Sequence, residues 1–263
     1  MIIKRIWPNN KWRNFHYLIA CEDTGQAVAV DPLDWKYCLN VAKSLGLTIT
    51  HILNTHEHLD HIGGNEELRV ATGARLLAHT GARETIKGID QGISHGDVLK
   101  IGRRLELQFL DTPGHTRTHL CVLAHGDTPA LICGDTLFNA GAGNCHNGGD
   151  VGLLYETFVN QFSQLSDKTT IHPGHDYLER NLAFTLNREP DNVAARLLLE
   201  RAQFSSGATA PVTTLGEERI TNTFFRLQNP QIIAGLRSSF PNFPETPDAK
   251  TIFMHLRALR NQW

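Results

Sequence analysis

Four side chains of metal-binding types lie within six consecutive positions of one short segment. The sequence reads THEHLDH over positions 55–61, directly after a β-rich run at 50–54. Side chains alternate along an extended chain, so His56, His58 and Asp60 are expected on one side, and a turn at the next two glycines brings His61 to the same place. Imidazole nitrogens mixed with a carboxylate suit zinc, iron or manganese, whereas calcium and magnesium sites use oxygen ligands. The segment therefore predicts a metal site.

Three later motifs repeat this arrangement, each after a short β-rich run. The sequence reads DTPGH over 111–115, GDT over 134–136 and HPGH over 172–175. Each motif alone is ordinary turn chemistry, but loops on a rigid scaffold are common places for ligands, and together the motifs supply enough for two ions. The predicted ligands are His56, His58 and His115 for one ion, Asp60, His61 and either His172 or His175 for the other, and Asp135 between the two.

The composition excludes several classes of protein. The 263 residues carry 25 Lys and Arg against 27 Asp and Glu, a net charge of −2. Because neither part of the chain is strongly one-signed, we expect no nucleic-acid partner and no membrane partner. The five cysteines are scattered without a Cys-x-x-Cys motif, which argues against a disulfide framework and favours a reducing cytosol. With no signal peptide or long apolar run in view, we expect a cytoplasmic protein.

The order of β-rich and helical segments predicts an α/β protein with a helical C-terminal part. Gly, Pro, Asp and Asn separate the segments. The predicted strands cover 15–20, 26–30, 50–54, 75–78, 97–101, 105–110, 119–124, 130–133 and 169–171. The predicted helices cover 35–45, 64–71, 151–165, 177–187, 193–204 and 249–260. Each metal-binding motif thus follows a strand.

The combined motifs resemble those of the metallo-β-lactamase superfamily and, within it, the glyoxalase II (hydroxyacylglutathione hydrolase) family. The tail narrows the resemblance, because GHDY at 174–177 is similar to the family's last ligand segment and LRALR at 256–260 is similar to its closing helix. The resemblance implies an αβ/βα four-layer sandwich over residues 1–175 and a helical, substrate-binding region over 176–263. It also selects His175 over His172 as the last ligand.

The resemblance further implies the hydrolysis of 2-hydroxyacyl glutathione thioesters, such as S-D-lactoylglutathione, to glutathione and a hydroxy acid. We expect a monomer with two divalent ions, zinc first, although iron or manganese suits the same ligands. Two such ions lower the pKa of a shared water toward about 7, so the resulting hydroxide needs no side-chain base. A thiolate, whose conjugate acid has a pKa of about 8.5, leaves without a strong general acid.

The resemblance also implies positions that contact the substrate. In the family, the carboxylates of glutathione meet two basic residues of the closing helix, and Arg257 and Arg260 match them. These arginines are three positions apart and share one helix face. Tyr177 matches the tyrosine that follows the last ligand. Beyond the glycine turn at 141–143 the family usually has a basic residue and, two positions on, an aromatic one, where this chain has Asn144 and His146.

Three other interpretations are open. A persulfide dioxygenase shares the fold and the histidine motif but uses a single iron and lacks the long helical tail, so residues 177–263 argue against it. A thioesterase or acyl hydrolase of other substrates uses the same centre. A zinc-stabilised binding module is disfavoured, because structural zinc sites are usually closed and four-coordinate. The remaining histidines are expected to be ordinary hydrogen-bonded or solvated side chains; they are His16, His51, His79, His95, His119, His125 and His255.

Overall fold

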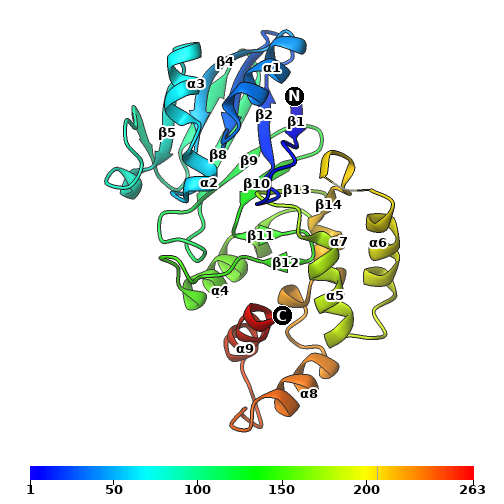
Figure 1. The fold of residues 1–263 in the computed structure, drawn as a ribbon. Helices are drawn as coiled ribbons and strands as arrows, with labels where there is room; N and C mark the ends of the chain where they lie inside the picture. The colour runs from blue at the N-terminus through cyan, green and yellow to red at the C-terminus, as the bar shows by residue number, and fades with distance from the viewer. Residues whose placement is uncertain (206) are drawn as a thin grey trace.

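Two six-stranded β-sheets form the centre of the molecule (Figure 1). The computed structural model describes residues 1–205 and 207–263. The first sheet has the order β1-β2-β3-β4-β5-β6, and its neighbours are antiparallel up to β3 and parallel from β3 onward. Its strands are β1 (Ile2–Ile6), β2 (His16–Ala20), β3 (Gln26–Val30), β4 (Thr48–Leu53), β5 (Arg75–His79) and β6 (Gln91–Ile93).

The second sheet has the order β14-β13-β10-β9-β8-β7. Only β10 and β13 pair in parallel, which places the ends of both strands at the same edge. A two-stranded ribbon, β11 (Leu137–Phe138) with β12 (Gly141–Ala142), follows β10. The strands of the second sheet are β7 (Val98–Ile101), β8 (Leu105–Asp111), β9 (Leu120–Ala124), β10 (Ala130–Gly134), β13 (Thr170–Pro173) and β14 (Thr213–Thr214).

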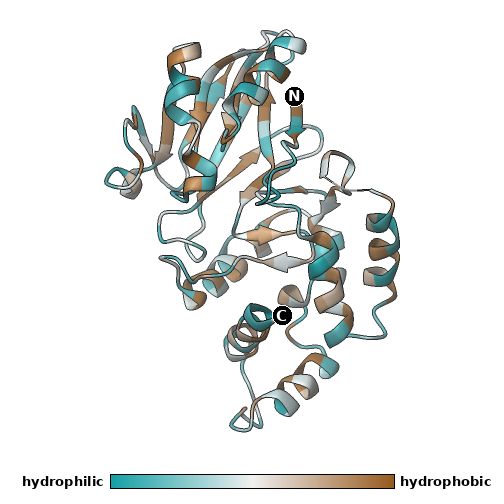
Figure 2. Cartoon of the chain, viewed as in Figure 1, coloured by the Kyte–Doolittle hydropathy of each residue, from teal (hydrophilic) through white to brown (hydrophobic). Residues whose placement is uncertain are grey.

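The alternation of side chains along the strands builds separate hydrophobic cores on the two faces of each sheet. Tyr17 of β2 and Val122 of β9 share the core between the sheets. Leu18 of β2 points the other way, into the core beneath α1 (Trp35–Ser44) and α3 (Asn65–Thr72). The strands are accordingly hydrophobic, whereas the helices alternate hydrophobic and hydrophilic faces (Figure 2).

The outer face of the second sheet packs against helices from later in the chain. Leu123 of β9 joins a core with residues of α4 (Val151–Asn160) and α9 (Ala249–Gln262). The order of layers is therefore helix, sheet, sheet, helix, and the predicted four-layer α/β sandwich with C-terminal helices is confirmed.

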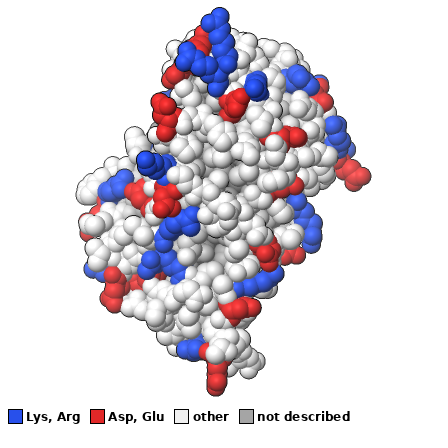
Figure 3. Space-filling view, turned by 180° about the vertical axis from the view of Figure 1, so that it is seen from behind, with Lys and Arg blue, Asp and Glu red and all other residues white. Residues whose placement is uncertain are grey.

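The C-terminal residues form a group of helices, of which α9 lies beside α4 (Figure 1). They are α5 (Leu178–Arg188), α6 (Val193–Gln203), α7 (Leu215–Thr221), α8 (Pro230–Ser239) and α9. This region also contributes β14 to the second sheet, where it pairs with β13. Within the described ranges, none of the helices has the length and apolar character needed to cross a membrane. On the face shown in Figure 3, acidic and basic side chains are interspersed.

Candidate metal centre

The four predicted motifs meet between the ends of strands from both sheets. The first motif follows β4, and the other three follow β8, β10 and β13. Parallel pairing of β10 with β13 sets Asp135 and His175 beside each other. The first motif differs from its predicted extended form, because His58 is the last extended residue and Asp60 lies in α2 (Leu59–Ile62). The helical turn, rather than strand alternation, directs Asp60 and His61 inward.

A glycine just after this turn lets the chain approach the loop that follows β3. A Cβ atom at Gly64 would lie 2.1 Å from the carbonyl oxygen of Pro32, in the loop after β3. The chain can therefore pass this close to the loop only if residue 64 has no side chain. This close approach brings the first motif against Asp31, the residue that follows β3.

Three imidazoles converge in the first ligand group. The Nδ1 atom of His58 lies 3.1 Å from Nε2 of His56 and 3.0 Å from Nε2 of His115. Ligand nitrogens around one tetrahedral zinc ion are separated by about 3.3 Å, given Zn–N bonds of about 2.0–2.1 Å. The group therefore has the dimensions of a three-histidine metal site.

A second group lies beside the first. Nε2 of His61 is 3.2 Å from Nε2 of His175 and 3.7 Å from Oδ2 of Asp60. Nε2 of His175 lies 3.6 Å from the same Asp60 oxygen. Both histidines are buried, and Asp60 is partly exposed. Two nitrogens and one carboxylate oxygen suit the same metals as the first group.

Asp135 stands between the two groups. Its Oδ2 atom is 3.5 Å from Nε2 of His115 and 3.1 Å from Nε2 of His175, and its Oδ1 atom is 3.5 Å from Nε2 of His61. The buried Oδ1 atom has no hydrogen-bond partner among the described residues. Because a buried carboxylate oxygen is rarely left unsatisfied, this orphaned atom fits a bridging metal ligand.

Each imidazole is held through the nitrogen that faces away from the centre. This arrangement leaves the inward nitrogen available as a ligand, and it is the usual outer support of a metal-binding histidine. The outward bonds are His56 Nδ1 to Thr55 Oγ1 (2.9 Å), His58 Nε2 to Asn147 O (3.1 Å), His61 Nδ1 to Asp31 Oδ2 (3.0 Å), His115 Nδ1 to Asn144 O (2.6 Å) and His175 Nδ1 to Trp12 O (2.7 Å).

The electrostatics of the centre favour a cation. Burial lowers the pKa of His115 to about 4 and keeps its imidazole neutral, the form that binds a metal. Burial acts in the same direction on His61, but the carboxylates of Asp135 and Asp31 outweigh it and raise that pKa to about 9. Positive charge is therefore stabilised strongly beside these two carboxylates.

Two supporting residues had not been singled out from the sequence. Asp31 accepts hydrogen bonds from the backbone N–H of Thr55 (2.9 Å) and from its hydroxyl (2.7 Å), as well as contacting His61. His119 stacks on His56 with ring centroids 5.2 Å apart, and its Nε2 accepts the backbone N–H of Asp135 at 3.1 Å. Both side chains are buried. They position ligands on both sides of the centre.

His172 lies outside both groups, although spacing had left it open as a ligand. Its Nε2 atom is 3.1 Å from the hydroxyl of Thr170, and its ring packs edge-on against Tyr17 with centroids 5.6 Å apart. Strand alternation explains this placement, because His172 is the third residue of β13 and its side chain faces the core between the sheets.

Two family models together match most of the chain. The metallo-beta-lactamase superfamily matches residues 17–178, and the hydroxyacylglutathione hydrolase C-terminus matches residues 176–263. A hydroxyacylglutathione hydrolase from Polaromonas sp. strain JS666 is 56% identical over 100% of both chains, and one from Nitrosococcus oceani is 55% identical over the same share. The chain belongs to the hydroxyacylglutathione hydrolase family. It is a metal-dependent hydrolase, as the sequence predicted.

Solved structures agree with this fold. A crystal structure of ETHE1 from Myxococcus xanthus has a TM-score of 0.68 at 27% identity and covers 99% of this chain and 98% of that one. The BLEG-1 B3 metallo-β-lactamase has a TM-score of 0.66 at 24% identity and covers 85% of this chain and 99% of its own. The second likeness shows the shared fold alone.

In this member of the hydroxyacylglutathione hydrolase family, a pocket of about 210 Å³ adjoins the metal centre. Tyr177 connects the two, because it lines the pocket and its ring stacks on that of His175 with centroids 5.0 Å apart. Four of the five predicted substrate-binding residues line it; the exception is His146, which is exposed elsewhere. The full lining is Phe138, Ala142, Asn144, Tyr177, Arg180, Asn181, Arg257 and Arg260.

Proposed function

We propose that this chain hydrolyses 2-hydroxyacyl glutathione thioesters, such as S-D-lactoylglutathione, to glutathione and a hydroxy acid. The observation that carries the proposal is the position of an arginine-lined pocket directly beside two ligand groups that share Asp135. The names of the two relatives at 56% and 55% identity support the same substrate class.

The ligand set supports two divalent ions. His56, His58 and His115 would hold one, Asp60, His61 and His175 would hold the other, and Asp135 would be shared between them. Zinc is the first candidate, and iron or manganese suits the same atoms. When bound, such a pair supplies Lewis acidity and a water whose pKa is lowered toward about 7.

In this proposal, the side chains of the pocket bind the glutathione moiety of the substrate. Tyr177 lies next to the metal centre, because its ring stacks on that of His175, and Arg260 lines the same pocket; both side chains offer donors to carboxylate or carbonyl oxygens. Arg257 supports the wall from behind, because its Nη1 donates to the carbonyl oxygens of Ala142 (2.6 Å) and Gly143 (3.2 Å). Asn144 contributes a neutral amide at the rim. A role for His146 stays a prediction.

Metal content and substrate choice test the proposal together. Purified protein loaded with zinc is assayed with S-D-lactoylglutathione and with the lactoyl thioester of N-acetylcysteamine, which lacks both carboxylates of glutathione. We expect about two ions per chain and a clear preference in kcat/KM for the glutathione thioester. One iron per chain with persulfide oxidation supports the dioxygenase alternative, and equal use of both thioesters supports an acyl hydrolase of other substrates.

The remaining parts of the proposal concern the division of the chain into regions, its oligomeric state, its partners and its cellular location. We propose a division into a metal-binding region, residues 1–175, and a substrate-binding region, residues 176–263. We further propose that the protein acts as a monomer on a small molecule, with no nucleic-acid or membrane partner. A relative from Arabidopsis thaliana, 34% identical over 224 residues, carries "cytoplasmic" in its name, and we propose the same location here. Sedimentation and cell fractionation test these points.

A further inference from the structure

Three guanidinium groups line the pocket beside the metal centre, and no carboxylate lines it. They belong to Arg180 of α5 and to Arg257 and Arg260 of α9. Among the described residues, none of the three forms an ion pair with Asp or Glu. Like charges in one small pocket repel each other unless an anion joins them. The pocket is therefore built for a ligand with negative charge.

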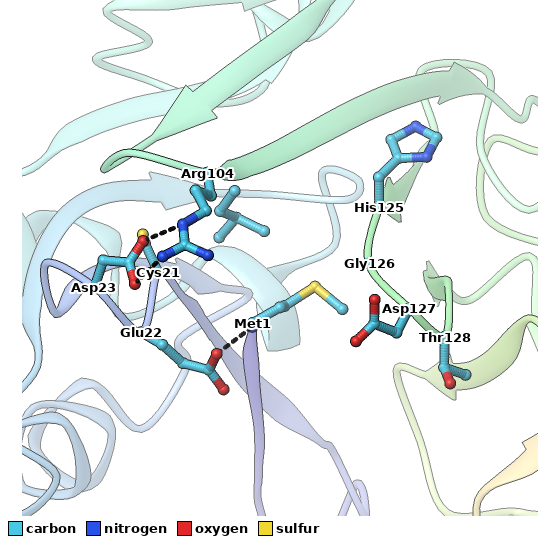
Figure 4. A pocket seen from close by; sticks show the side chains of 10 residues that line it. Met1, Cys21, Glu22, Asp23, Arg104, His125, Gly126, Asp127 and Thr128 are labelled. Carbon is cyan, nitrogen blue, oxygen red and sulfur yellow. Dashed lines mark hydrogen bonds and ion pairs between the residues drawn. The ribbon is translucent and has the colours of Figure 1, made fainter.

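In another pocket of the molecule, by contrast, the cations are paired with carboxylates. A pocket of about 460 Å³ at the N-terminal end of β1 also contains cations (Figure 4). There, Arg104 pairs with Asp23 at 2.7 Å, and the amino group of Met1 pairs with Glu22 at 2.9 Å. Its positive charges are already neutralised, so it shows no comparable preference for an anion.

Two of the three arginines beside the metal centre are already engaged by the protein. Arg257 is buried and holds the carbonyl oxygens of the glycine turn. Arg260 donates from Nε and Nη2 to Oδ1 of Asn181, at 3.3 and 3.0 Å. Arg180 is exposed, and within the described part of the chain it has no hydrogen-bond partner. Of the three, it has the most donors available for a ligand.

The charges of Arg180 and Arg260 also act on each other. Burial is the main cause that lowers the pKa of Arg260 to about 10, and the positive charge of Arg180 adds to it. Arg180 and Arg260 therefore line the same pocket closely enough for their charges to interact.

We propose that Arg180 is a specificity-determining residue that binds a carboxylate of the glutathione moiety together with Arg260. The inference rests on the proposed function. Glutathione carries two carboxylates, and the polar lining of the pocket apart from the three arginines is neutral: Asn144, Tyr177 and Asn181. Arg180 therefore supplies the additional positive charge that a substrate with two carboxylates requires.

The test compares Arg180→Gln with wild type on two substrates, S-D-lactoylglutathione and lactoyl-N-acetylcysteamine. An exposed ion pair is modest in strength, so we expect KM for the glutathione thioester to rise about three- to fivefold with kcat unchanged. KM for the short thioester should stay constant. Arg180→Lys keeps the charge and should restore most of the affinity. Raising the salt concentration should increase KM of the wild type more than that of Arg180→Gln.

Arg196→Gln is the matched control, because Arg196 is an exposed arginine on the next helix, α6, outside the pocket. It should leave both KM values unchanged. Equal effects of Arg180→Gln on both thioesters, or no effect on either, would overturn the assignment of Arg180 while leaving the proposed function intact. A wild-type enzyme that fails to prefer lactoylglutathione would instead overturn the proposed function and this inference with it.

Discussion

The substitution Asp31→Asn changes a residue that supports a metal ligand and leaves the ligand, His61, in place. Oδ2 of Asp31 accepts two hydrogen bonds, from the hydroxyl of Thr55 at 2.7 Å and from Nδ1 of His61 at 3.0 Å. Asparagine has nearly the same shape but presents an NH2 group in place of one oxygen. If the NH2 group of the asparagine faces His61, the Nδ1–H of His61 meets a second donor and has no acceptor. The imidazole then shifts its proton to Nε2, the nitrogen that faces Asp60 and His175.

The expected magnitude follows from this geometry. Leaving one buried donor unsatisfied costs about 1–3 kcal/mol, and loss of an outer hydrogen bond to a metal ligand typically reduces metal affinity by about 10–100-fold. These two ranges agree, since tenfold corresponds to about 1.4 kcal/mol. The effect should fall on the ion held by Asp60, His61 and His175. The ion held by the three-histidine group should be affected much less.

Competition with a chromogenic chelator measures both affinities in one titration, and thermal unfolding of the metal-free proteins checks that the variant folds. Asp111→Asn is the control, because Asp111 also pairs with a histidine, His79, at 3.2 Å and is outside both ligand groups. It should leave both affinities unchanged. Equal weakening of both sites in Asp31→Asn, or no change in either, would refute this account of Asp31.

Four further outcomes are expected. Asp135→Ala should abolish hydrolysis and lower metal content by elemental analysis; full loading with retained turnover would contradict its bridging role. His175→Ala should lose one metal equivalent, whereas His172→Ala should keep both, and the reverse would show that the wrong histidine is assigned. Burial raises the pKa of Glu218 from 4.5 to about 7, so the folded protein retains a proton that the unfolded chain releases. Stability to urea should therefore fall as pH rises from about 5 to 7, and Glu218→Gln should lack this slope. Arg257→Gln should lower kcat as well as raise KM, because it releases the glycine turn; a change in KM alone would mean that this arginine only binds substrate.

Most strands and helices with repeated hydrophobic periodicity could be predicted from the sequence, whereas the short or edge elements were missed, as was the ten-residue helix α8. β1 was missed because Lys4 and Arg5 interrupt its apolar pattern; at this sheet edge Lys4 stays exposed, while Arg5 is partly buried and donates to the carbonyl oxygens of Ala208 and Ala210. α7 has only seven residues, too few for a repeated apolar stripe. Its capping box at Thr214 and Glu217 was the available signal.

The ligands could be predicted because metal ions are bound by only a few types of side chain. In this chain several of those side chains lie close together in the sequence. The supports of these ligands could not, because several are single residues from distant segments. Asp31 directly follows a buried strand, which was a usable signal, but nothing in the sequence connects it with His61. Other supports are the backbone carbonyls of Trp12 and Asn144, which any residue type supplies. Only the fold brings these oxygens to the outward nitrogens.

One contact between the C-terminal helices and the loop that carries Asp135 runs through the glycine turn. Arg257 of α9 holds the carbonyl oxygens of Ala142 and Gly143. The backbone N–H of Gly143 in turn donates to the carbonyl oxygen of Thr136 at 3.1 Å. A Cβ atom at Gly143 would lie 1.9 Å from the carbonyl oxygen of Asp135, so only glycine allows the turn to press against this residue. The tail therefore does more than provide a surface for the substrate. It fixes the loop that carries Asp135, and through that loop it couples the shape of the pocket to the geometry of the metal centre.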